Sequence, residues 1–191
     1  MGIFELPEGY TEIKRIDLQK NIKLAILVNI GALVIAGLVF FVGTFVTPFS
    51  FSIDYENLTG TLLMLGGILL AMILYLVAHE LIHGVFIKKY SGKKARYGFT
   101  GLYAYAGSDA CFAKGPYLVI GLAPVVFFGV LCLLLNVFLP MEWFWPVYFI
   151  QIINVSGAAG DLYITCLMIR MPADTLVKDD GVAMSIYCKE E

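Results

Sequence analysis

The chain has 191 residues, of which 60% are hydrophobic and only 15% are charged, and its mean hydropathy is +0.84. An average soluble domain carries roughly 25% charged residues, so this composition indicates an integral membrane protein and excludes an ordinary soluble domain. The net charge of −2 lacks the basic excess that nucleic-acid binding requires, which excludes that class of partner. The length suits a single domain, residues 1–191.

Four apolar stretches are long enough to cross a bilayer as helices, since a span needs about 20 residues. They are residues 22–46, 62–87, 116–139 and 143–169. The first is too long for the apolar core of a signal peptide, which has roughly 7–15 residues, so we expect an anchor helix. The sequence therefore predicts an all-α integral membrane fold with four transmembrane helices.

The segments outside these stretches are polar. Before the first stretch, residues 6–21 mix apolar and charged side chains, which fits a short interfacial helix or a solvated leader equally well. The loop 88–115 contains a Gly- and Tyr-rich run that predicts either a short hairpin near the membrane or an amphipathic surface loop. The acidic end, residues 172–191, reads as a polar tail.

The basic residues predict the orientation of the chain. All 13 of them lie before or at the very start of the first stretch, where Lys23 is the second residue, in the 88–115 loop or after the fourth stretch. The remaining two connections carry only acids, namely Asp54, Glu56 and Glu142. Because Lys and Arg favour the cytoplasmic side, we expect a multi-pass protein of the cell membrane with both termini, the 88–115 loop and the tail in the cytoplasm.

The stretch LVAHELIHGV, residues 76–85, carries the chemistry. It holds His79 and His83, the only two histidines of the chain, with Glu80 between them. On a helix, residues i and i+4 share a face, so both imidazoles can bind one Zn²⁺ while the carboxylate acts as a general base. A chance HExxH is expected in roughly one such chain per thousand. A glutamate inside a membrane also costs about 2.5–3.5 kcal/mol, which disfavours an idle one.

A third zinc ligand has to come from another helix. Asp161 lies nine residues before Arg170, and His79 lies nine residues before Lys88, so on helices that run in the same direction they reach the same depth. Asp161 is therefore the candidate third ligand. Asn154 lies seven residues before it and points the same way, which fits a substrate or oxyanion contact as well as ordinary helix–helix hydrogen bonding.

HELIH with a later Asn and Asp on a membrane helix resembles the site-2-type intramembrane zinc metalloproteases. A closer resemblance, over nearly the whole chain, is to the putative zincin peptidase family of small bacterial membrane proteins. It is carried by the stretches LPEGYTEIKRIDL, HELIHG, LAPVV, GD at 160–161 and DTLVKDDGVAMSIY. The chain departs from the site-2 pattern around Asp161, because the proline-containing stretch is missing and Leu162 stands in place of a glycine.

These resemblances imply a role for each residue of the motif. His79 and His83 correspond to the zinc-binding pair, Glu80 to the catalytic glutamate and Asp161 to the third ligand. By the same resemblance, the 88–115 loop would present an edge strand that clamps an unwound substrate by strand addition.

The first hypothesis is a zinc-dependent intramembrane or membrane-proximal endopeptidase that acts on a membrane protein or peptide. The alternative is a membrane zinc-binding or metal-transport protein without protease activity, although transport needs further intramembrane ligands that the other helices hardly supply. A third reading is a non-hydrolytic relative that binds membrane partners. A homodimer fits a small chain whose site lies near its surface.

Overall fold

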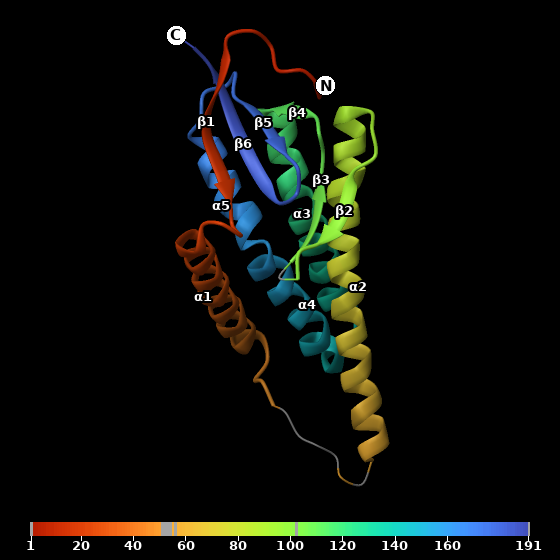
Figure 1. Cartoon of the computed structure of the whole chain (residues 1–191). Coiled ribbons are helices and arrows are strands. Elements are labelled where there is room, and N and C mark those ends of the chain that lie inside the picture. Colours follow the sequence, from red (N-terminus) through yellow and green to blue (C-terminus); the bar gives the residue numbers. More distant parts are fainter. Residues whose placement is uncertain (1, 51–54, 56, 102, 191) are drawn as a thin grey trace.

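The computed structural model of the chain describes residues 2–50, 55, 57–101 and 103–190, and it combines long helices with a small sheet at one end (Figure 1). The helices are α1 (Ile22–Val46), α2 (Leu58–Ser91), α3 (Lys114–Phe138), the 3-10 turn η1 (Met141–Trp143), α4 (Phe144–Gly157) and α5 (Ala159–Ile169). The strands are β1 (Tyr10–Asp17), β2 (Arg96–Phe99), β3 (Ala104–Gly107), β4 (Cys111–Ala113), β5 (Leu176–Asp179) and β6 (Ala183–Lys189).

Among the described residues, α1, α2 and α3 are long and apolar enough to cross a membrane. The first predicted stretch coincides with α1 at both ends, while α2 is longer than predicted by several residues at either end. The fourth predicted stretch, 143–169, is not one straight helix, because α4 and α5 are bent by 44° at Ala158. The bent pair counts as a fourth span if it crosses as one unit. Asp54 and Glu56 lie outside the described residues.

The all-α prediction is wrong, because both ends of the chain form a sheet. Four antiparallel strands lie in the order β1-β6-β5-β4, and β1 pairs with β6 from Tyr10 opposite Lys189 to Asp17 opposite Ala183. Residues 6–21 thus contain a strand in place of an interfacial helix or solvated leader, and the acidic tail contributes two strands. The physical reason is that strand formation here depends on a partner far away in the sequence.

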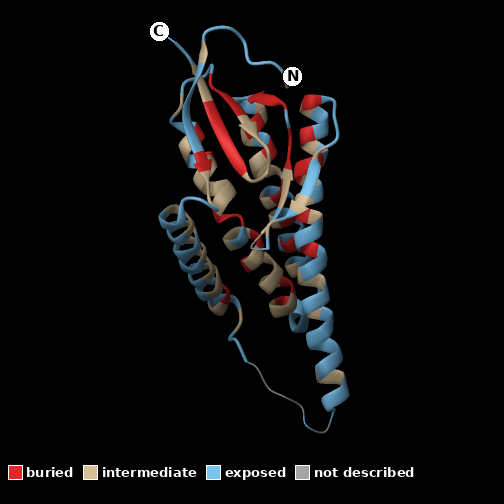
Figure 2. Ribbon diagram, in the orientation of Figure 1, coloured by how far each residue is buried: buried red, intermediate tan, exposed pale blue. Residues whose placement is uncertain are grey.

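The sheet packs on the ends of the helices and closes the core there (Figure 2). The buried cluster draws side chains from the sheet and from α2, α3 and α5, among them Ile16, Ile87, Phe112, Ile120, Met168, Val177 and Ile186. Away from the sheet, α1 and the first half of α2 expose apolar side chains over most of their surface (Figure 2). This pattern suits contact with lipid tails, which solvate apolar side chains as a protein core would.

The predicted hairpin in the 88–115 loop is confirmed, with β2 and β3 pairing from Arg96 opposite Gly107 to Phe99 opposite Ala104. Strand β3 lies along α2. After β3, the backbone N–H of Ser108 donates to the carbonyl of Asp179 in β5 over 2.7 Å. The hairpin is therefore fixed between the long helix and the sheet.

Candidate metal centre

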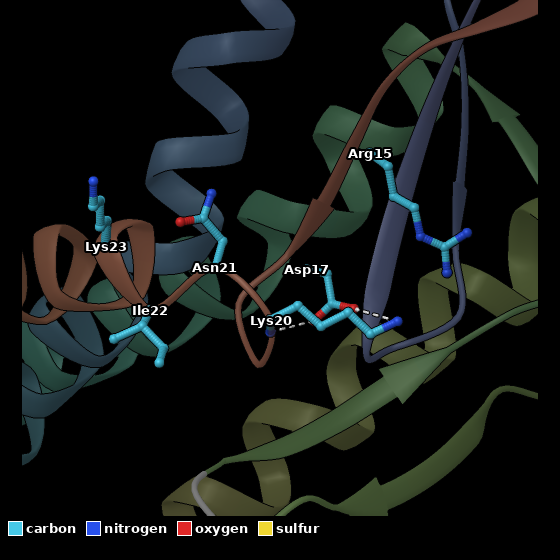
Figure 3. A pocket seen from close by; sticks show the side chains of 6 residues that line it. All are labelled: Arg15, Asp17, Lys20, Asn21, Ile22 and Lys23. Atoms are coloured by element: carbon cyan, nitrogen blue, oxygen red, sulfur yellow. Dashed lines mark hydrogen bonds and ion pairs between the residues drawn. The ribbon is translucent and has the colours of Figure 1, made fainter.

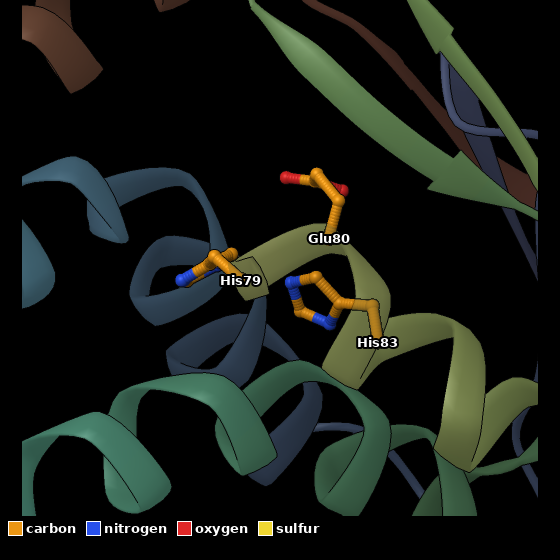
Figure 4. Close-up of side chains that lie close together, drawn as sticks. All are labelled: His79, Glu80 and His83. Carbon is orange, nitrogen blue, oxygen red and sulfur yellow. The ribbon is translucent and has the colours of Figure 1, made fainter. Parts of the chain in front are cut away.

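Helix α2 buries a single stripe of side chains. Among its buried residues, Tyr75, His79, His83, Ile87 and Ser91 follow one another at intervals of four. Since residues four apart lie one above another on a helix, both histidines point to the same side, and their ring centroids lie 4.9 Å apart (Figure 4). The histidines are 7% and 9% exposed, so the neighbouring helices enclose them.

The bend between α4 and α5 brings Asp161, in the first turn of α5, to the two histidines. One oxygen of Asp161, Oδ2, lies 3.5 Å from Nε2 of His79 and 3.7 Å from Nε2 of His83. Two ligands that each bind zinc at about 2.1 Å in a tetrahedron are about 3.4 Å apart. The depth argument from the sequence thus leads to a donor set whose spacing fits zinc.

Glu80 takes a different position from Asp161. Its carboxylate belongs to the group with His79 and His83 whose candidate ligand atoms all lie within 4.8 Å of one another (Figure 4). Two carboxylates therefore border the histidine nitrogens. Of the two, Asp161 has the oxygen that approaches both Nε2 atoms at tetrahedral spacing. Glu80 lies beside the two histidines on α2.

The other ring nitrogen of each histidine is bonded to protein. Nδ1 of His79 lies 3.0 Å from the hydroxyl of Tyr75, and Nδ1 of His83 lies 2.8 Å from the carbonyl oxygen of Ile120 in α3. Outer partners of this kind usually orient metal-binding histidines. Sequence reasoning missed both of them, although Tyr75 precedes His79 by four residues on the same face.

Asn154 lies beside this network and is fully buried. Its Oδ1 accepts a hydrogen bond from the Tyr75 hydroxyl at 3.2 Å, and its Nδ2 donates to the carbonyl of Val125 at 3.0 Å. The predicted proximity of Asn154 to the site is therefore found, through Tyr75 and not through a direct contact with the three metal-site residues.

A hollow lies away from the metal centre, where β1 passes into α1. It has a volume of about 600 Å³ and is lined by Arg15, Asp17, Lys20, Asn21, Ile22 and Lys23 (Figure 3). Lys20 is paired with Asp17 at 3.8 Å, and Lys23 points away from Arg15 and Lys20. The basic side chains do not converge on one point, so the hollow forms no second ligand set.

The chain matches a known family of proteins. A family model described as putative zincin peptidase matches residues 72–176, more than half of the chain. The matched span contains His79, Glu80, His83, Asn154 and Asp161, and it begins just before the buried stripe of α2. No curated protein and no solved structure matches the chain.

Proposed function

The chain belongs to the putative zincin peptidase family, and from this premise we propose that it is an endopeptidase that cleaves membrane proteins or peptides within or close to the bilayer. The family implies zinc as the cofactor, and the His79, His83 and Asp161 donor set fits that ion. The observation that carries the proposal is the location of this donor set. Its two histidines lie on α2, a helix of membrane-spanning length, and its carboxylate lies on α5, half of the bent pair that could form a fourth span.

The residues divide the reaction between them. His79, His83 and Asp161 would hold the ion, which would lower the pKa of a bound water toward neutrality and polarise a carbonyl oxygen. Glu80 accepts the proton of the attacking water and passes it to the leaving amine. Partial burial of the site restricts water to the reacting position, while 32% exposure of the Asp161 side chain keeps the centre accessible.

The hairpin supplies a place for the substrate backbone. Within the described strands, β2 pairs only with β3, and its other edge is available for a further strand. An extended peptide added there would gain main-chain hydrogen bonds to β2. Strand addition explains how a protease of this kind would hold a substrate segment in the unwound form that hydrolysis requires.

Several expectations from the sequence accompany this proposal as predictions. They are a multi-pass location in the cell membrane, cytoplasmic termini, a homodimer, and the absence of nucleic-acid partners. The long apolar helices support the membrane location.

The test compares Glu80→Gln with wild type in the same zinc-loaded preparation. Loss of the base is expected to reduce cleavage of membrane-fraction proteins by about 10²–10⁴-fold with zinc content unchanged, because the histidines and Asp161 remain. Glu142→Gln, in the exposed turn η1, makes the same chemical change away from the centre and should cleave like wild type. Undiminished cleavage by Glu80→Gln would refute the role of Glu80 as the general base. If wild type instead takes zinc up into vesicles and cleaves nothing, the alternative of a metal-transport protein without protease activity is favoured.

A further inference from the structure

The two histidines must each carry their proton on one particular nitrogen to bind a metal. A neutral imidazole holds a proton on Nδ1 or Nε2, and only the nitrogen without it can be a ligand. In both rings Nε2 faces the carboxylate of α5, so the proton has to lie on Nδ1. We propose that three residues outside the HExxH motif, Tyr75, Asn154 and Pro124, are positioning residues that fix this protonation pattern in His79 and His83.

For His79 the pattern follows from a chain of hydrogen bonds with one consistent direction. The carbonyl of Val125 can only accept, so the amide nitrogen of Asn154 faces it at 3.0 Å. The amide oxygen of Asn154 then accepts the proton of the Tyr75 hydroxyl at 3.2 Å. With that proton committed, the Tyr75 oxygen is free to accept from His79, whose Nδ1 lies 3.0 Å away. Nε2 of His79 is left with its lone pair for the ion.

For His83, the protonation pattern is fixed by a proline in the neighbouring helix. Pro124 lies inside α3 and has no backbone N–H, so it cannot bond to the carbonyl four residues earlier, which is that of Ile120. This carbonyl accepts from Nδ1 of His83 at 2.8 Å instead. Because a carbonyl cannot donate, His83 must carry its proton on Nδ1. The proline of the LAPVV stretch thus releases the acceptor that this ligand needs.

Burial keeps both arrangements free from competition with water. Asn154 and Pro124 are among the most deeply buried side chains, and Tyr75 is 5% exposed. The two ends of the Asn154 amide are already bonded to protein, which favours a positioning role over contact with a substrate. The inference rests on the zinc site and is independent of peptide cleavage, so its test measures zinc affinity.

The first test is Tyr75→Phe, which removes the acceptor of His79 and keeps the ring packed on Phe128 at 4.9 Å. Loss of such an outer partner typically weakens metal binding 10–100-fold, and we expect a loss of this size in a competition with a zinc chelator. Tyr148→Phe is the matched control. It removes a hydroxyl that donates to the carbonyl of Val39 at 2.8 Å, and it should bind zinc like wild type. Wild-type affinity in Tyr75→Phe would overturn the proposal for His79.

A double substitution distinguishes the hydrogen-bond chain described above from a general effect of side-chain packing on zinc binding. In Asn154→Leu the Tyr75 hydroxyl has lost its acceptor and turns its proton toward His79, which favours the wrong protonation pattern. Adding Tyr75→Phe removes that wrong donor, so the double variant should bind zinc no more weakly than Asn154→Leu alone. If the losses of zinc affinity in the two single variants multiply in the double variant, the proposed hydrogen-bond chain is contradicted.

Pro124→Ala tests the proposal for His83, because it restores a backbone N–H that competes for the Ile120 carbonyl. We expect severalfold weaker zinc binding, less than for Tyr75→Phe since a carbonyl oxygen has two lone pairs. Pro116→Ala is the control, because Pro116 lies in the first turn of the same helix, where no helical carbonyl lies four residues before it. Equal affinity in the two proline variants would remove Pro124 from the proposal.

Nitrogen NMR gives a readout that a purely structural role would not move. The chain has only two histidines, so histidine-specific ¹⁵N labelling of the zinc-loaded protein yields few signals. The Nδ1 signal of His79 should shift in Tyr75→Phe, and that of His83 should shift in Pro124→Ala. Unchanged Nδ1 signals in folded, zinc-loaded variants would overturn the proposal.

Discussion

The hydroxyl of Tyr97 in β2 lies against Gly84 in α2 so closely that a Cβ on Gly84 would overlap the Tyr97 oxygen. Gly84 immediately follows His83, so the hairpin touches α2 within one turn of Glu80. The absence of a side chain at Gly84 therefore sets how near the hairpin comes to the centre. A larger residue requires the Tyr97 side chain, or the hairpin that carries it, to move, because Gly84 belongs to the rigid backbone of a helix.

We predict that Gly84→Ala separates the hairpin from the centre without removing zinc. Overlap of this kind typically costs about 1–3 kcal/mol or is relieved by a backbone shift. Faster hydrogen exchange in residues 96–107, lower peptide cleavage and unchanged zinc content are expected. Gly66→Ala in the same helix is the control, because a Cβ at Gly66 meets no atom within 4 Å. If both variants exchange and cleave alike, the hairpin does not depend on this contact.

The zinc ligands give the second prediction. Asp161→Ala removes the oxygen that approaches both histidines at 3.5 and 3.7 Å. Zinc affinity should fall by more than the roughly 10–100-fold that loss of an outer partner costs. Asp109→Ala removes another aspartate side chain, which pairs with Arg96 at 2.8 Å in the hairpin region, and it should keep zinc. Equal zinc content in the Asp161 variant and wild type would mean that Glu80, and not Asp161, is the third zinc ligand.

Asp179, in β5, gives a prediction on pH. Burial raises the pKa of Asp179 above its ordinary value of 3.8, and the charges of Asp161 and Asp180 add to this, while bonds from the Tyr117 hydroxyl and the Gly181 N–H oppose it. A raised pKa means that the folded chain binds the proton more tightly than the unfolded chain. The contribution of Asp179 to stability is therefore fully present below pH 3.8 and is lost as the pH rises through the raised pKa.

Thermal unfolding of wild type and Asp179→Asn between about pH 4 and pH 7 measures this loss. Wild type should lose stability relative to Asp179→Asn as the pH rises, since the amide does not ionise. Asp109→Asn, whose parent side chain is 61% exposed, serves as the control for a lost surface charge. A constant difference between wild type and Asp179→Asn over this range would contradict the assignment.

Features that depend on neighbouring residues could be predicted from the sequence. Twenty or more apolar residues require a helix in a membrane, which is why the bounds of α1 were correct. The i, i+4 spacing of His79 and His83 fixes their common face, and equal depth placed Asp161 opposite them. Each of these arguments needs only helix geometry.

Features that depend on distant residues could not be predicted in the same way. Strand β1 buries only Ile16, so its sequence shows no clear alternation, and it is ordered by pairing with β6 at the other end of the chain. The bond from His83 to the Ile120 carbonyl requires the packing of α2 on α3. A signal for it was nevertheless present in the sequence, because Pro124 inside an apolar helix must leave one carbonyl without its usual partner.

Pairing of the two chain ends leads to the last prediction, which concerns topology. Because β1 and β6 belong to one sheet, we predict that the N-terminal and C-terminal segments lie on the same side of the membrane and that the chain between them crosses it an even number of times. Four crossings meet this condition only if the bent pair α4 and α5 counts as one span. The basic residues then predict that this side is the cytoplasm.

Cysteine labelling of whole cells tests the crossing number and the orientation separately, in a chain whose own four cysteines are replaced by alanine. Met141→Cys, in the exposed turn between α3 and α4, should react with an impermeant reagent from outside. Lys94→Cys, between α2 and the hairpin, should react only after the membrane is opened, as should cysteines added at both termini. The reverse pattern would invert the orientation and leave the sheet intact. Termini that label on opposite sides would mean that β1 and β6 cannot pair, because a bilayer core of about 30 Å would separate them.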